Sequence, residues 1–294
     1  MICKSCPRQC NIERLPDVFS GGFCRMPYNA VLARAALHLW EEPVISGKNG
    51  SGAIFFSGCN LRCVFCQNEE ISHEDFGKAV SKDHFIDIMK SLEAQGAHNI
   101  NLVNPSHFVP FIKEALESYR PSVPVVYNSG GYDSLESLKS LEGLIDIYLP
   151  DFKYISSQKA KQYAKAADYP KVAMAAILEM RRQVKDVFKA DGMMQSGLLI
   201  RHLVLPKNVP DAIAILTWIR DTLGKDTFVS LMSQYTPYRK DYPYKELNRR
   251  LCSAEYQKVL DAFFELGLHN GFMQERSAAN GAFTPAFDLT GIEK

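Results

Sequence analysis

Short apolar stretches and amphipathic helical stretches alternate along most of the chain. We expect strands at 53–56, 100–103, 123–127, 144–149, 198–205 and 228–232, and helices at 83–96, 108–119, 134–141, 172–187, 209–223 and 254–268. Strands separated by helices of this length pair in parallel through right-handed crossovers. Because there are six such units rather than eight, the pattern predicts an α/β fold, a partial (β/α)6 barrel of parallel strands.

In folds of this kind, functional residues lie on loops that leave the carboxyl ends of the strands. A cysteine-rich loop follows the first predicted strand, and the polar segments "NPSH", "NSGGY" and "PDFKY" follow the next three. We therefore expect all four loops to open onto one mouth.

Seven of the eight cysteines lie in two clusters, and Cys252 stands apart as an expected ordinary buried thiol. The first residues carry no apolar export signal, so we expect reducing conditions, in which structural disulfides are rare. Close cysteine clusters then indicate metal sites.

The cluster after the first strand has three cysteines in a C-x3-C-x2-C array: Cys59, Cys63 and Cys66. Structural zinc takes four ligands, and no histidine lies within 58–68. A 4Fe–4S cluster normally takes four cysteines, so three leave one iron open to a ligand that is not protein. A zinc knuckle with a fourth ligand from elsewhere is the alternative.

This array, with the aromatic Phe65 just before its last cysteine, resembles the radical S-adenosylmethionine (SAM) enzymes. The segment "CVFCQN" is similar to that of the pyruvate formate-lyase activating enzymes. The resemblance implies a 4Fe–4S cluster whose open iron binds the amino and carboxylate groups of SAM. One electron, from a donor such as flavodoxin or ferredoxin, then cleaves SAM to methionine and a 5′-deoxyadenosyl radical. That radical abstracts a hydrogen atom from a substrate.

The resemblance also assigns SAM contacts to the polar loops. Where the family carries Gly-Gly-Glu, this chain has "NPSH", so Asn104 and Ser106 are the candidate neutral acceptors. A helix cap by Ser106 is the alternative. The segment "NSGGY" resembles the family's Asp-Thr-Asn-Gly turn, which places Asn128 and Ser129 near the SAM carboxylate. A simple turn is the alternative there.

Two further segments match the family's charged positions. "PDFKY" resembles Asp-x-Lys, and Asp151 and Lys153 share one side of an extended backbone. A surface ion pair is the alternative. "IRHLVLP" resembles Arg-x-Val-Val-Pro, and Arg201 in an apolar strand needs a partner, such as the SAM carboxylate or ribose. His202 faces the other side as an expected core histidine.

The second cluster has C-x2-C-x3-C-x13-C spacing: Cys3, Cys6, Cys10 and Cys24. Four thiolates can close a structural zinc site or hold a complete second iron–sulfur cluster, or the patch can be free of metal. We favour zinc. Such amino-terminal modules are similar to those of uncharacterised relatives of the pyruvate formate-lyase activating enzyme. We expect a module at 1–48, the barrel at 49–245, and a helix and tail packed on it at 246–294.

Composition excludes several partners. The 294 residues carry a net charge of +1 with no basic run, so we expect no nucleic acid. No stretch approaches the roughly 20 apolar residues of a membrane span, so we expect a soluble, cytoplasmic protein. Three functions remain: activation of a partner glycyl-radical enzyme, radical chemistry on a small molecule or peptide, and metal binding or electron transfer without catalysis. No side chain is singled out as catalytic.

Overall fold

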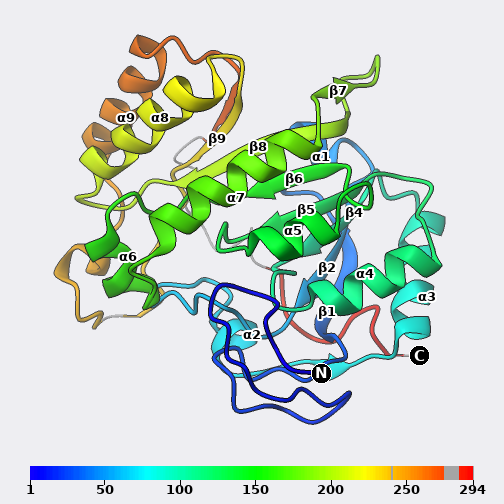
Figure 1. The fold of residues 1–294 in the computed structure, drawn as a ribbon. Coiled ribbons are helices and arrows are strands. Elements are labelled where there is room, and N and C mark those ends of the chain that lie inside the picture. The colour runs from blue at the N-terminus through cyan, green and yellow to red at the C-terminus, as the bar shows by residue number, and fades with distance from the viewer. Residues whose placement is uncertain (240, 275–284, 294) are drawn as a thin grey trace.

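A mostly parallel sheet forms the centre of the computed structural model, which describes residues 1–239, 241–274 and 285–293 (Figure 1). Its parallel part runs in the spatial order β10-β9-β8-β6-β5-β4-β2. These strands are β2 (Ser51–Phe56), β4 (Ile100–Val103), β5 (Val125–Ser129), β6 (Ile147–Pro150), β8 (Met194–Leu203), β9 (Phe228–Met232) and β10 (Gly271–Met273). The six predicted strands and their parallel pairing are confirmed, and β10 extends the sheet beyond them.

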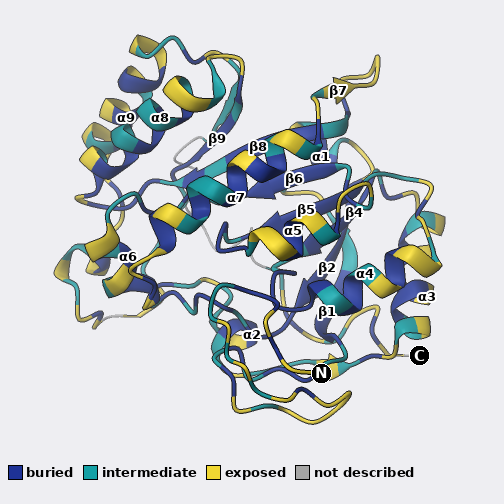
Figure 2. Cartoon of the chain, in the orientation of Figure 1, coloured by how far each residue is buried: buried dark blue, intermediate teal, exposed yellow. Residues whose placement is uncertain are grey.

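A helix follows each predicted strand, as expected. These helices are α3 (Lys82–Ala94), α4 (Val109–Ser118), α5 (Leu135–Ser140), α7 (Tyr169–Gln183), α8 (Val209–Leu223) and α9 (Ser253–Glu265). In α3, the Ser81 hydroxyl accepts the His84 N–H, and apolar residues at helical spacing are buried. Figure 2 shows the same division into a buried and an exposed face on the other helices. Shorter elements are α1 (Pro43–Ser46), α2 (Glu69–His73), α6 (Ser157–Ala164) and the 3-10 helix η1 (Lys245–Asn248).

The sequence did not predict the antiparallel edge of the sheet. Strand β1 (Val31–His38) pairs antiparallel with β2, and the short β3 (Lys78–Ala79) pairs with β1. Strand β7 (Val187–Phe188) forms a hairpin with β8. Residues 1–30 form loops and turns, and their β-structure is limited to one antiparallel bridge between Ile2 and Glu13. The predicted module at 1–48 thus contains a strand that belongs to the main sheet.

One cavity of about 590 Å³ is lined by side chains from β2, β4, β5, β8, β9 and β10, and by Asp151 directly after β6. All of these parallel strands therefore turn one face to the same space. Within the described residues the ends of the sheet, β10 and β3, do not pair with each other. The sheet is an open, partial barrel, as the sequence predicted.

Two further findings concern the surface. In the described part of the chain, no helix has the length and apolar character needed to cross a membrane. The prediction that Cys252 is buried is wrong: it is exposed and forms the amino-terminal cap of α9, where its backbone N–H donates to Glu255.

Candidate functional site

The three-cysteine loop begins directly after β2 and reaches α2, and all three of its cysteines line the cavity. Gly58 opens the loop with a φ of +74°, and a side chain there would lie 2.4 Å from Met26. Glycine is therefore required by both backbone conformation and space. Cys63 is buried, whereas Cys59 and Cys66 are half-buried.

The loop supplies hydrogen-bond donors to its own sulfurs. The backbone N–H groups of Leu61 and Arg62 lie 3.3 and 3.4 Å from Cys59 Sγ. The Tyr154 hydroxyl donates to Cys63 Sγ at 3.4 Å. Burial raises the pKa of Cys63 to about 12, so iron binding there must displace a proton. Cysteine sulfurs surrounded by such donors fit an iron–sulfur cluster, which hydrogen bonds to sulfur stabilise and tune.

No three His, Cys, Asp or Glu side chains within the described ranges converge on a position for a single metal ion. A 4Fe–4S cluster does not require this convergence, because each cysteine binds a different iron.

The "NPSH" segment is divided between the cavity and the core. Asn104 lines the cavity with a φ of +64°, and its side-chain N–H donates to the Gly58 carbonyl at 2.7 Å. This bond ties the segment to the start of the cysteine loop. Ser106 is 1% exposed and is not among the cavity-lining residues. The alternative role of Ser106 as a helix cap is wrong, because the cap of α4 is Phe108, without a side-chain hydrogen bond, whereas a contact of Ser106 with SAM stays a prediction.

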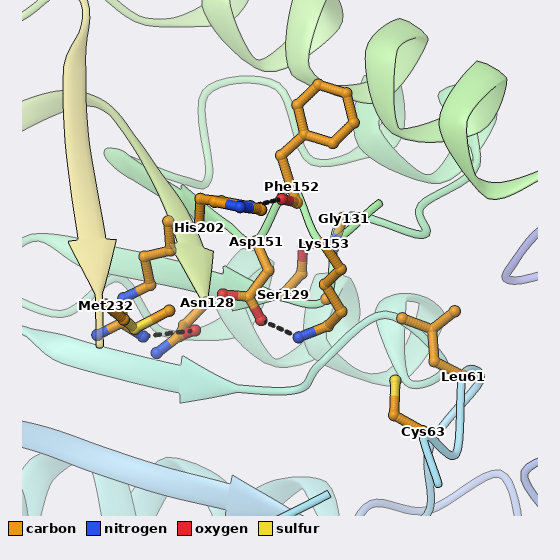
Figure 3. A network of polar contacts seen from close by, with 12 residues as sticks. Leu61, Cys63, Asn128, Ser129, Gly131, Asp151, Phe152, Lys153, His202 and Met232 are labelled. Atoms are coloured by element: carbon orange, nitrogen blue, oxygen red, sulfur yellow. Dashed lines mark hydrogen bonds and ion pairs between the residues drawn. The ribbon is translucent and has the colours of Figure 1, made fainter. Parts of the chain in front are cut away.

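Asp151 and Lys153 form an ion pair that lines the cavity, next to the loop that carries Cys63 (Figure 3). The two side chains are 21% and 23% exposed, so this is not a pair on the outer surface. Desolvation would lower the pKa of Lys153, but the charge and hydrogen bond of Asp151, together with the nearby Cys63, outweigh it and hold that pKa above its usual value. Lys153 therefore carries a firmly held positive charge beside the cysteine loop.

Arg201 has partners within the chain that the sequence did not reveal. Its Nε and Nη2 donate to the two oxygens of Glu42 at 2.9 Å each, and Nη2 also pairs with Glu41. Nη1 donates to Asn128 Oδ1 at 3.3 Å. All four side chains line the cavity. The argument that Arg201 needs SAM as its partner therefore fails, although a contact with SAM stays a prediction.

Asn128 and Ser129 end β5 on the cavity wall. The Ser129 hydroxyl donates to Asp133 at 2.6 Å, and the Tyr127 hydroxyl donates to the same carboxylate at 2.8 Å. The sequence analysis missed Asp133. Gly131 is needed in this turn, because a side chain would lie 2.2 Å from the Asp151 carbonyl.

The remaining predicted side chains occupy the expected faces. Phe65 lines the cavity and packs edge-on against Tyr163 and Tyr235, with ring centroids 6.0 and 5.8 Å away. His202 is buried on the opposite face of β8, where its Nδ1 and the Phe152 carbonyl are 2.7 Å apart (Figure 3). The prediction of a core histidine is confirmed.

The amino-terminal cysteines lie near one another, but within the described residues they do not converge on one position for a metal ion. Cys3, Cys6 and Cys24 are buried and Cys10 is half-buried. Burial raises the pKa of Cys6 to about 12, and the other three thiols lie near enough to raise it further.

Arg8 fastens this module to the cysteine loop. Its guanidinium donates to the carbonyls of Asn60, Ala164 and Lys165 at 2.8, 2.9 and 2.6 Å. The same group lies 3.8 Å above the Phe23 ring. The module and the loop are therefore parts of one packed unit.

The chain has an α/β fold, and its three-cysteine loop fits a 4Fe–4S cluster. A family model described as "4Fe-4S single cluster domain" matches residues 45–166, which include the whole loop, and supports a 4Fe–4S cluster as its cofactor. The chain belongs to the same family as the uncharacterized protein MJ0674 of Methanocaldococcus jannaschii. The two are 30% identical over 271 residues, which cover 88% of this chain and 73% of that protein.

Solved structures show a more distant likeness. SuiB of Streptococcus suis is 12% identical, over 76% of this chain and 48% of its own, with a TM-score of 0.49. Methylornithine synthase (PylB) is 13% identical, and the match covers 74% of this chain and 68% of that protein, with a TM-score of 0.47. This chain thus spans about half the length of SuiB.

Proposed function

We propose that the protein is a radical SAM enzyme that binds a 4Fe–4S cluster through Cys59, Cys63 and Cys66. The observation that carries the proposal is that this three-cysteine loop opens into a cavity of about 590 Å³. That volume is in the range of small-molecule sites and leaves space for a ligand beside the cluster. When bound, the cluster supplies the electron that cleaves SAM to methionine and a 5′-deoxyadenosyl radical.

The chain's own residues would position SAM and exclude water. Lys153 places a positive charge beside the loop, where it can attract the SAM carboxylate. Asn128 and Ser129 offer polar atoms on the adjacent wall. Phe65 and Tyr235 form an apolar side of the same cavity and restrict water.

The substrate distinguishes two versions of this proposal. In one, the radical takes the glycine hydrogen of a partner enzyme, and in the other it acts on a small molecule or peptide. Leu39 and Trp40 line the cavity while each is 56% exposed, which favours a substrate that also contacts the protein outside the cavity. We propose a cytoplasmic enzyme reduced by a flavodoxin or ferredoxin. We also propose zinc at the four amino-terminal cysteines, whose thiols would have to move closer together to bind one ion, because they do not converge on one position in the described structure.

The test is reductive cleavage of SAM by anaerobically reconstituted protein. About four irons should load on this loop, and reduced protein should release 5′-deoxyadenosine and methionine. Alanine at Cys59, Cys63 or Cys66 should abolish cleavage, whereas Cys252→Ala, at an exposed helix cap, should leave it intact. A cluster that loads without any SAM cleavage would instead support an electron carrier.

A further inference from the structure

Tyr154 brings a buried hydroxyl to one of the three cluster cysteines. It is 1% exposed, and its hydroxyl donates to Cys63 Sγ at 3.4 Å. Its ring packs against Tyr163 and Tyr169, with centroids 5.9 and 5.3 Å away. The phenol is therefore held in place by packing on both sides and cannot swing away from the sulfur without disturbing the core.

We propose that Tyr154 is a positioning residue that raises the reduction potential of the cluster through this hydrogen bond. The inference rests on the proposed function, since it requires a cluster at Cys63. Reduction adds negative charge, which the ligating sulfurs share. A donor aimed at one of these sulfurs stabilises the reduced form more than the oxidised form, so the potential becomes less negative.

The bond has its largest effect at Cys63 because of the surroundings of that sulfur. Cys63 is the most buried of the three cysteines, and a hydrogen bond is electrostatically stronger where water is excluded. Lys153 is the nearby cation, but its ammonium is paired with Asp151. The positive charge of Lys153 is therefore partly neutralised at Cys63, and the Tyr154 hydroxyl is the direct hydrogen-bond donor to that sulfur.

The donor at Cys63 can also be removed cleanly. Cys59 receives its hydrogen bonds from backbone N–H groups, which no side-chain substitution deletes. Tyr154→Phe removes one oxygen atom and leaves the ring and its contacts. Tyr163→Phe is the matched control, because Tyr163 packs against the same ring but its hydroxyl donates to Glu246.

The experiment is an anaerobic redox titration of the reconstituted cluster without SAM, followed by electron paramagnetic resonance. We expect Tyr154→Phe to bind the same amount of iron as the parent and to shift the midpoint potential to a more negative value. Tyr163→Phe should have the same midpoint potential as the parent. Incorporation of 3-fluorotyrosine at position 154, which makes the phenol a stronger donor and keeps the packing, should shift the potential in the opposite direction.

An unchanged potential in loaded Tyr154→Phe, or an equal shift in Tyr163→Phe, overturns this inference and leaves the proposed function standing. If Tyr154→Phe fails to bind the cluster, the protein with 3-fluorotyrosine at position 154 provides the test. An unchanged midpoint potential in that protein overturns the inference. A parent protein that binds no cluster at this loop overturns the proposed function as well.

Discussion

Replacing Arg201 by methionine tests whether this residue is first of all a structural counter-ion. The guanidinium is 14% exposed and lies between the side chains of Glu41 and Glu42, which are 7% and 6% exposed. Methionine keeps much of the volume but leaves two adjacent carboxylates without a cation. Removing one partner of a buried ion pair costs about 3–5 kcal/mol, because the other charge stays buried and unpaired.

The remaining hydrogen bonds decide where in that range the cost falls. Asn101 still donates to Glu41 at 2.9 Å, and Ser230 still bonds to Glu42. These neutral donors offset part of the loss, so we expect Arg201→Met to lower the free energy of unfolding by about 3–4 kcal/mol near neutral pH. With about 2 °C for each kcal/mol in a chain of this size, Tm should fall by roughly 6–8 °C.

The cost should depend on pH in a defined direction. Desolvation raises the pKa of Glu42, but the Arg201 guanidinium outweighs it and holds that pKa below the usual value. The stability from this pair is therefore present above the unfolded pKa of about 4.3 and is lost as pH falls through the lowered folded pKa. In the variant the folded pKa of the same carboxylate lies above the unfolded one, so acid favours folding. The deficit should be largest near pH 7 and shrink toward pH 5.

The assay is anaerobic thermal and denaturant unfolding of the reconstituted protein at two pH values. Arg220→Met is the control, since that arginine pairs on the surface with its neighbour Asp221 and should be nearly neutral. Adding Glu41→Gln and Glu42→Gln to Arg201→Met should restore most of the stability. A loss below about 1 kcal/mol, or the same loss at both pH values, would refute the reasoning.

Three other outcomes follow from the site. Lys153→Ala should weaken SAM binding by about 2–5 kcal/mol while iron content stays near that of the parent, and equal SAM dissociation constants by equilibrium dialysis would contradict it. Metal analysis should find about one zinc per chain at the amino-terminal cysteines. A variant with alanine at all four of these cysteines should lose stability yet still cleave SAM. A content of about eight irons per chain without zinc would reverse this assignment. Arg8→Ala should reduce stability by about 2 kcal/mol and speed the loss of loop iron to a chelator, and unchanged iron release would show that its three bonds do not support the loop.

The parts of the fold that the sequence predicted are those with a local signal. The strand and helix order follows from hydrophobic periodicity within windows of a few residues. The cavity-facing positions of Asp151 and Lys153 follow from the two-residue repeat of an extended chain, since both lie just after β6. The cysteine loop was predicted because its C-x3-C-x2-C spacing is contained within eight consecutive residues.

The parts that the sequence did not predict depend on contacts between distant segments. An arginine in an apolar strand, such as Arg201, predicts a buried partner. No local pattern shows that Glu41 and Glu42, 160 and 159 residues away, are that partner. Tyr154 follows Lys153 directly, yet its role appears only when Cys63, 91 residues earlier, is placed beside it. Strand β1 was missed because its sequence, VLARAALH, does not alternate between apolar and polar residues.

The attachment of the amino-terminal module has a consequence for the loop that carries Cys59. Arg8 reaches acceptors that are 52 and 157 residues further along, so the docked module depends on segments that are distant in the sequence. The Cys24 carbonyl then lies 3.0 Å from the position that a side chain on Gly58 would take, directly behind the residue that precedes Cys59. Docking of the first cysteine set thus closes the rear of the second. The two cysteine sets consequently belong to one packed unit, in which the segment around Cys24 forms the rear wall of the loop that carries Cys59.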